Sequence, residues 1–314
     1  MRYRVGCDIG GTNVKMGLVD PSGRVVRVLV LPSPSKSHPR AMVASLKRGY
    51  KAISQGSGVR NKVAGLGIGI AGVIDFGKGI VHTSPNLPQW KEVPLQKWAE
   101  EILGVRIRVD NDANVVVLGE FMAGAARGAR QVVGLTLGTG VGGGVVIDGR
   151  LYRGSRGGAG EIGHCTVQAD GPRCSCGNRG CLERYVGAKY LVDRYLKIKG
   201  KGNSITPAVI AERAKKGDGA AVRVLIEAGE WIGVACANLI NLLQPEVIVI
   251  GGGVAGAGRI LFEAIRKTVR ERSFKASRCG VRVVPGKLKE KAGIIGAASL
   301  LVLKRETRDV RRKT

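Results

Sequence analysis

The chain has 314 residues, of which 44% are hydrophobic and 24% are charged, so it is long enough for two domains with a substantial core. No apolar stretch reaches the roughly 18 residues of a membrane span, and the N-terminus lacks the shape of a signal peptide, so we expect a cytoplasmic protein with no membrane partner. The net charge of +27 is spread along the chain without interleaved aromatic side chains to stack on bases, which argues against a specific nucleic-acid partner.

The first predicted element is an apolar strand that ends in a glycine turn, Asp8-Ile-Gly-Gly-Thr12. Glycine lets the backbone N–H groups approach phosphate oxygens closely, and the threonine hydroxyl adds a donor. Asp8 stands at the strand end, where a carboxylate holds Mg²⁺ directly or through water during phosphoryl transfer. We therefore predict that this turn binds the phosphates of a nucleotide, through Asp8, Gly10, Gly11, Thr12, Asn13 and Lys15.

The sequence next predicts strands at 63–70 and 105–109 and a helix at 113–124. Polar residues gather between the second of these strands and the helix. A carboxylate in the loop before that helix can orient an acceptor hydroxyl and take its proton, so Asp110 and Asp112 are both candidate bases. The structural alternative is that one of the two aspartates caps the helix. Asn86, in a proline-stiffened loop, either hydrogen-bonds a sugar or makes a turn.

An internal repeat is visible when residues 5–20 are laid over residues 133–148. In each copy an apolar strand breaks at glycines and a hydroxyl, a second strand returns, and an Asp precedes a Gly-Arg turn. Two such hairpins predict a duplicated α/β architecture with a cleft between the copies. The second copy adds Gly138, Thr139 and Gly140 as candidate phosphate ligands.

The segment after the second hairpin has the pattern of a metal site. His164, Cys174, Cys176 and Cys181 offer one nitrogen and three sulfur ligands, a closed tetrahedral set that suits a structural Zn²⁺. Its expected task is to hold Glu161, His164 and Glu183 in place. The alternatives are two disulfides or four buried thiols, and the remaining cysteines suggest a reducing cytoplasm.

The second half of the chain is predicted to be mainly helical, with helices at 206–217, 219–243 and 291–303 and a strand at 246–250. The strand opens into Gly251, Gly252 and Gly253, which leave room for an adenosine. Neither a Walker-type loop nor a dinucleotide-binding fingerprint is present. We place a smaller domain at 1–119 and a larger one at 120–314, with the terminal helix able to pack back on the first.

Together these motifs resemble the ROK family (repressors, open reading frames and kinases), over residues 4 to about 303. The resemblance rests on residues 8–12, 110–114, 137–140, 161–164 and the cysteine run that ends at Glu183. It implies the actin-like ATPase (ribonuclease H-like) fold, with two α/β domains around a cleft that receives ATP with Mg²⁺ and a hexose. It also implies a homodimer or homotetramer.

The resemblance implies a role for each matching residue. Asp112 would be the catalytic base that activates the sugar 6-hydroxyl. The sugar would be contacted by Gly72, Asn86, Asn111, Asp112, Glu161, His164 and Glu183. One departure is that Ala71 precedes Gly72 where the family often has proline, which puts the pocket shape there in doubt.

The expected activity is ATP-dependent phosphorylation of a hexose at the 6-hydroxyl, with glucose converted to glucose 6-phosphate. The alternatives are an N-acetylglucosamine or N-acetylmannosamine kinase and a fructokinase, which differ by a few pocket contacts. A more distant alternative is a sugar-sensing transcriptional regulator that uses the basic tail from Lys304 on. The family's repressors carry an N-terminal helix-turn-helix domain, for which we expect no room before Asp8.

Overall fold

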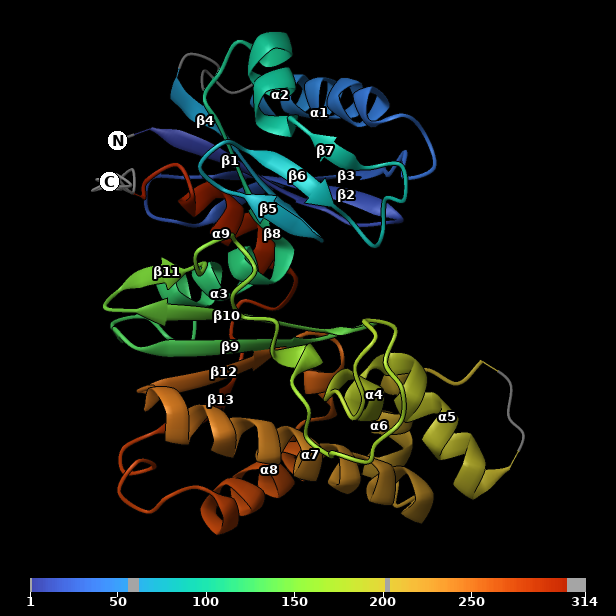
Figure 1. The fold of residues 1–314 in the computed structure, drawn as a ribbon. Coiled ribbons are helices and arrows are strands. Elements are labelled where there is room, and N and C mark those ends of the chain that lie inside the picture. The colour runs from blue at the N-terminus through green and yellow to red at the C-terminus, as the bar shows by residue number, and fades with distance from the viewer. Residues whose placement is uncertain (1, 56–61, 201–203, 304–314) are drawn as a thin grey trace, which may run out of the picture. The chain divides into compact units, whose positions relative to one another are not determined.

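The computed structural model describes residues 2–55, 62–200 and 204–303, which form two compact units (Figure 1). Unit 1 contains the chain up to Val115 together with the segment from Gly293 on, and unit 2 runs from Val116 to Ala292. The predicted division into domains at 1–119 and 120–314 stays a prediction. None of the described helices combines the length and apolarity needed to cross a bilayer.

Unit 1 is built on a five-stranded sheet with the order β3-β2-β1-β4-β8. The first three strands pair antiparallel, and β4 and β8 run parallel to β1. The central strands read as continuous apolar runs because both faces of the sheet are covered, whereas the edge strand β3 alternates. The strands are β1 (Tyr3–Ile9), β2 (Asn13–Val19), β3 (Val25–Pro32), β4 (Val63–Ile70) and β8 (Ile107–Asn111).

Helices cover both faces of this sheet. Gly49 of α1 packs against Met16, and Ile294 of α9 packs against the neighbouring Gly17, so the two helices lie on opposite faces of β2. A small three-stranded sheet completes the unit. These elements are α1 (Pro39–Ser54), α2 (Leu95–Leu103), α9 (Ala292–Ser299), β5 (Val73–Asp75), β6 (Ile80–Thr83) and β7 (Lys91–Val93).

Unit 2 repeats the same sheet, with the order β11-β10-β9-β12-β13. Again the first three strands pair antiparallel and the last two run parallel to the central one. The duplicated α/β architecture predicted from the repeat is therefore confirmed. The strands are β9 (Val132–Leu137), β10 (Val141–Ile147), β11 (Arg150–Tyr152), β12 (Val247–Gly251) and β13 (Arg282–Pro285).

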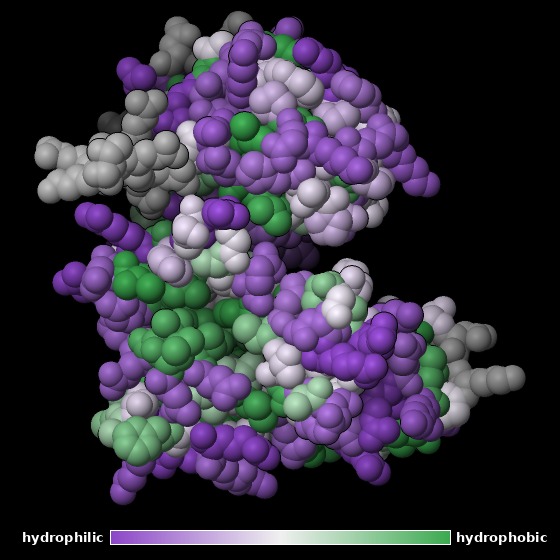
Figure 2. Space-filling model, viewed as in Figure 1, coloured by the Kyte–Doolittle hydropathy of each residue, from purple (hydrophilic) through white to green (hydrophobic). Residues whose placement is uncertain are grey.

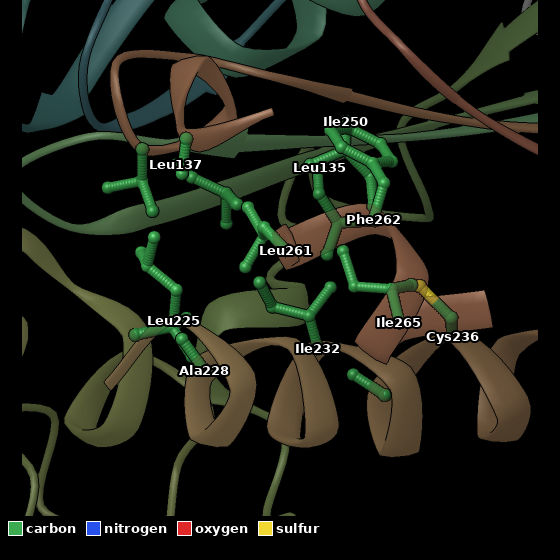
Figure 3. Packing of buried hydrophobic residues seen from close by; sticks show 14 of the residues in the cluster. Leu135, Leu137, Leu225, Ala228, Ile232, Cys236, Ile250, Leu261, Phe262 and Ile265 are labelled. Carbon is green, nitrogen blue, oxygen red and sulfur yellow. The ribbon is translucent and has the colours of Figure 1, made fainter. Parts of the chain in front are cut away.

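The core of unit 2 lies between this sheet and two long helices (Figure 3). Leu135 and Ile250 of the sheet face Ile232 of α7 and Leu261 of α8, and all four side chains are buried. Figure 2 shows hydrophobic residues gathered over β9–β11 of this unit. The helices of unit 2 are α4 (Glu183–Val186), α5 (Ala188–Lys199), α6 (Pro207–Lys215), α7 (Gly219–Leu243) and α8 (Arg259–Arg272), with 3-10 turns at Ile162–His164, Val254–Ala257 and Lys289–Lys291. Helix α3 (Asp112–Ala123) begins in unit 1 and continues into unit 2.

Most predicted elements are present, with corrected ends. The strand at 63–70 and the helix at 219–243 have the predicted bounds. The strand expected at 105–109 is β8, two residues further on, and the terminal helix expected to reach 303 ends at Ser299. Helices α1, α2, α5 and α8 were not predicted. The basic tail from Lys304 lies outside the described residues.

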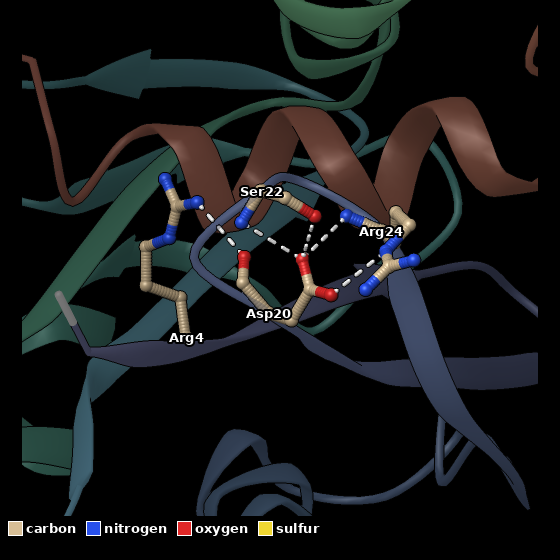
Figure 4. Close-up of polar contacts among 4 residues, drawn as sticks. All are labelled: Arg4, Asp20, Ser22 and Arg24. Carbon is tan, nitrogen blue, oxygen red and sulfur yellow. Dashed lines mark hydrogen bonds and ion pairs between the residues drawn. The ribbon is translucent and has the colours of Figure 1, made fainter.

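The turn between β2 and β3 is organised by one carboxylate, that of Asp20 (Figure 4). Its Oδ1 accepts hydrogen bonds from the backbone N–H groups of Ser22 and Arg24 and from the Ser22 hydroxyl, at 2.9, 3.0 and 2.6 Å. Its Oδ2 accepts from Arg24 Nε at 3.0 Å. The hydrogen bond from Ser22, helped by those from Arg24, lowers the pKa of Asp20 to about 2 even though burial opposes this.

We expect Asp20→Ala to lower the free energy of unfolding at pH 7 by about 1–3 kcal/mol, because several donors lose a charged acceptor. The pKa of Asp20 is lower in the folded chain than its ordinary value of 3.8. Its contribution is therefore complete above that value and is lost as the pH falls toward about 2. Urea titrations should show the deficit of the variant shrinking over this range, whereas Glu101→Ala, at an exposed position of α2, should stay near wild type.

Two glycines let α9 lie directly on the sheet of unit 1. A Cβ on Gly67 would overlap the backbone carbonyl of Ala297, and one on Gly6 would overlap that of Ile294. We expect Gly67→Ala to destabilise the protein by about 1–3 kcal/mol, because the helix backbone must move away. Gly219→Ala, at the open first turn of α7, is the matched control and should be neutral or stabilising in the same urea titration.

Candidate functional site

In unit 1, the glycine turn between β1 and β2 lies beside the predicted sugar residue Asn86. The turn is closed by a hydrogen bond from Gly10 N–H to the Asn13 carbonyl at 2.9 Å. A Cβ on Gly11 would stand 3.6 Å from the Cβ of Asn86, so the two residues are neighbours. Thr12 and Asn13 are exposed at the tip, where their side chains can reach a ligand.

Two carboxylates of unit 1 have raised pKa values. Burial raises the pKa of Asp8 to about 6, the negative charge of Asp112 adds to the rise, and Lys15, its cross-strand neighbour, opposes it. Burial also raises the pKa of Asp112, against a hydrogen bond from the Ala113 N–H. Such a pair favours binding of a cation or uptake of a proton, as metal-assisted phosphoryl transfer requires.

The helix that carries Asp112 is capped by Asn111, not by an aspartate, so that part of the sequence prediction was wrong. Asn111 Oδ1 accepts from the N–H groups of Ala113 and Asn114 at 2.8 and 3.1 Å. Asp110 is buried at the end of β8, where its Oδ1 accepts from Asn111 N–H and Asn114 Nδ2 at 2.8 and 3.1 Å. Asp110 therefore holds the junction together.

The carboxylate of Asp112 accepts fewer hydrogen bonds from other described residues than that of Asp110. It is the first residue of α3, and its carboxylate lies at the positive end of the helix dipole. Among the described residues, its carboxylate accepts a hydrogen bond from one other residue, the Ala113 N–H at 2.9 Å. Of the two candidate bases, Asp112 is thus the one with capacity for a substrate hydroxyl.

Gly72 is fixed by its backbone. Its φ is +133°, and a Cβ would overlap the Thr83 carbonyl, so no other residue fits here without strain. The Gly72 carbonyl accepts from Asn111 Nδ2 at 3.0 Å, which joins it to the start of α3. The structure therefore groups Gly72, Asn111 and Asp112 within unit 1.

In unit 2, the two glycine loops predicted to meet a nucleotide are neighbours. Gly138–Gly140 follows β9 and Gly251–Gly253 ends β12, and these strands run parallel side by side. Gly252 has a φ of +90°, and a Cβ there would overlap the backbone of Leu137. Both loops thus leave the same edge of the sheet, the edge where ligands bind in parallel α/β structures.

The predicted metal ligands of unit 2 also come together. One ligand atom from each of His164, Cys174, Cys176 and Cys181 lies within 4.8 Å of all the others. Cys176 Sγ and Cys181 Sγ are 3.7 Å apart, as are Cys174 Sγ and His164 Nδ1. Two thiolates about 2.3 Å from one tetrahedral zinc stand at roughly this spacing, whereas a disulfide needs about 2.05 Å.

The donor set favours a cation on chemical grounds. Burial, followed by the neighbouring Cys176 and Cys174 thiols, raises the pKa of Cys181 to about 12. A thiolate at this position therefore needs a positive charge beside it. Gly180, with a φ of +64°, passes so close to the Gln168 carbonyl that only glycine fits there.

One part of the site carried no signal in the sequence. Ala188 N–H donates to the Gly138 carbonyl at 3.0 Å, and Val141 N–H donates to Glu183 Oε2 at 2.9 Å. The segment that begins at Glu183 therefore holds the β9–β10 turn from outside. Backbone groups supply most of these contacts, and a backbone N–H looks the same in every residue.

Comparison with known proteins gives the class. The ROK family model matches residues 4–304, so the chain belongs to the ROK family. The glucokinase of Thermotoga maritima is 35% identical over 95% of this chain and 96% of its own length. The structure of a ROK family glucokinase from Streptomyces griseus, in complex with glucose and AMPPNP, matches with a TM-score of 0.82 at 34% identity, covering 95% of this chain and 98% of that one.

A regulator is also similar. The xylose repressor of Caldicellulosiruptor bescii is 32% identical over 80% of this chain but only 66% of its own length. The predicted family and its actin-like fold are confirmed by these matches. The predicted roles of single residues stay predictions.

Proposed function

We propose that this chain is an ATP-dependent sugar kinase that transfers the γ-phosphoryl group of ATP to the 6-hydroxyl of a hexose, with glucose as its substrate. The observation that carries the proposal is Asp112, a carboxylate with a raised pKa at the start of α3, which accepts a hydrogen bond from one other described residue, Ala113. Glucokinases that align over nearly their full length with this chain support it. We further propose that the protein acts in the cytoplasm as a homodimer or homotetramer.

In the proposed reaction Asp112 orients the 6-hydroxyl and accepts its proton as the phosphoryl group arrives. Burial brings its pKa closer to the working pH than that of a solvated aspartate. Asn111 keeps the carboxylate in place through its bonds to Gly72 and to α3. The base therefore stands on a rigid element rather than on a loop.

The nucleotide would be held by the glycine loops. The β1–β2 and β9–β10 turns offer backbone N–H groups and the hydroxyls of Thr12 and Thr139 to the phosphates. Asp8 would hold Mg²⁺, which neutralises charge on the transferred group. Gly251–Gly253 would leave space for the adenosine.

The sugar would be recognised by hydrogen-bonding side chains. Carboxylates accept strong hydrogen bonds from hydroxyl groups, and side-chain amides both donate and accept hydrogen bonds. We assign this role to Gly72 as a backbone contact and to the side chains of Asn86, Asn111, Glu161, His164 and Glu183.

We propose a structural zinc ion on His164, Cys174, Cys176 and Cys181. His164 Nδ1 lies on the cysteine side, 3.7 Å from Cys174 Sγ, which leaves Nε2 for a sugar hydroxyl. Zinc on one ring nitrogen fixes the tautomer, so the other nitrogen carries the proton and donates. The ion supplies folding energy to the loop and no bound water for chemistry.

The kinase proposal predicts a large effect at Asp112. Asp112→Asn should lower kcat for glucose by roughly a hundredfold or more, with a far smaller change in KM, because the base is lost but the shape is kept. A coupled ADP-release assay measures both. Asp193→Asn, at an exposed position of α5, is the matched control. Near-normal turnover by Asp112→Asn would contradict the assignment and move the test to Asp110.

Substrate choice is tested by a panel of sugars in the same assay. Glucose should give the highest kcat/KM among glucose, fructose, N-acetylglucosamine and N-acetylmannosamine. A strong preference for N-acetylmannosamine would replace glucokinase with the alternative kinase. Failure to phosphorylate any sugar would leave the regulator reading, for which the xylose repressor is the precedent.

Zinc removal should lower thermal stability and glucose affinity together, because the proposed metal orders the loop that carries His164 and Glu183. Cys176→Ser should reproduce both losses, and metal analysis should show less than one zinc per chain. Cys279→Ser, an exposed thiol outside the cluster, should change neither. Full glucose affinity in a verified metal-free preparation would contradict this role.

A further inference from the structure

The carboxylate of Glu183 fits directly against the β9–β10 turn. Its Oε2 accepts a hydrogen bond from Val141 N–H at 2.9 Å, at the point where the turn re-enters the strand. The preceding residue is Gly140, and a Cβ there would overlap the same oxygen. The carboxylate therefore requires glycine at position 140.

The turn is held at its other end by the same segment. Gly187 N–H donates to the Glu183 carbonyl at 2.9 Å, and the next residue, Ala188, donates to the Gly138 carbonyl at 3.0 Å. Residues 183–188 therefore bracket the turn on both sides. Thr139 is left exposed at its tip.

Glu183 is itself tied to the metal cluster. Cys181 lies two residues before it, and the intervening Leu182 is fully buried and donates its N–H to the Cys165 carbonyl at 3.0 Å. A shift of the cysteine loop would move the carboxylate, and with it the turn.

From these contacts we propose that Glu183 is a positioning residue for the nucleotide as well as a sugar ligand. Its Oε2 fixes the Gly138–Gly140 turn, while its Oε1, which has no hydrogen-bond partner among the described residues, receives a sugar hydroxyl. The inference rests on the proposed function. One carboxylate then serves both substrates, so bound sugar stiffens the turn and tightens nucleotide binding.

The test is the dissociation constant of a non-hydrolysable ATP analogue with Mg²⁺, measured by calorimetry on the zinc-loaded full chain. Glucose should tighten binding to the wild type by about fivefold or more. Glu183→Ala should weaken sugar-free binding by roughly five- to tenfold, the effect of one lost charged hydrogen bond, and abolish the response to glucose. Glu183→Gln keeps an acceptor for Val141 N–H and should recover most of the sugar-free affinity.

Two further variants separate this role from general damage. Gly140→Ala disturbs the same contact from the turn side, and combined with Glu183→Ala it should weaken the analogue no further than either change alone. Glu263→Ala removes an exposed carboxylate of α8 and should leave analogue affinity unchanged.

The inference is overturned if Glu183→Ala binds the analogue as tightly as the wild type without sugar. It is also overturned if Glu183→Gln is as weak as Glu183→Ala. A wild-type chain that binds the analogue but phosphorylates no sugar contradicts the proposed function alone, because the sugar-free measurements still decide the role of Glu183. A wild-type chain that binds no analogue contradicts both.

Discussion

The side chain of Asn111 joins three parts of unit 1, and the place of the candidate base depends on it. Its amide nitrogen donates to the Gly72 carbonyl, and its oxygen accepts from two N–H groups at the start of α3. The last pair of β8 with β4 brings Asn111 into the sheet, opposite Ile70. Asp112 therefore follows a residue that is held by the sheet, by a loop and by the helix at once.

Two helices each pack on the sheet of one unit although they directly follow the last strand of the other. Val117 of α3 packs on Gly134 of the unit 2 sheet, although α3 begins directly after the last strand of unit 1. Ile294 of α9 packs on Gly6 of the unit 1 sheet, although α9 follows the last strand of unit 2. Gly6 and Gly134 occupy the same position in the repeat. In each copy this position lacks a side chain, and the helix packs directly on it.

The sequence predicted best the parts that depend on neighbours in the chain. The strand at 63–70 is a continuous apolar run, and α7 is long, amphipathic and capped by Asp218, so both were found with their bounds. The four side chains predicted to bind a metal do lie together, because their spacing along the chain is short. Short spacing along the chain carries this information by itself.

Contacts made across the fold were missed. The strand β8 extends to Asn111, because Asp110 and Asn111 pair with Gly69 and Ile70, 41 residues earlier in the chain. Asn111, and not an aspartate, then caps α3. The bond between Glu183 and Val141 N–H was invisible for a similar reason, since its donor is backbone. Sequence reasoning named the chemical groups of the site, and only the folded chain shows which of them are already used.

The two turns of the repeat differ in charge. Asp8 in the first copy stands where Thr136 stands in the second, so only the first turn carries a carboxylate at its strand end. Under the proposed function, a carboxylate at the first turn would suit a cation, and neutral donors at the second would suit phosphate oxygens. In the first copy, Lys15 lies opposite Asp8 on the neighbouring strand. In the second copy, the carboxylate of Glu183 accepts a hydrogen bond from the backbone N–H of Val141 at the end of the turn. The two copies therefore share one strand order, while their turns carry different side chains at the strand end.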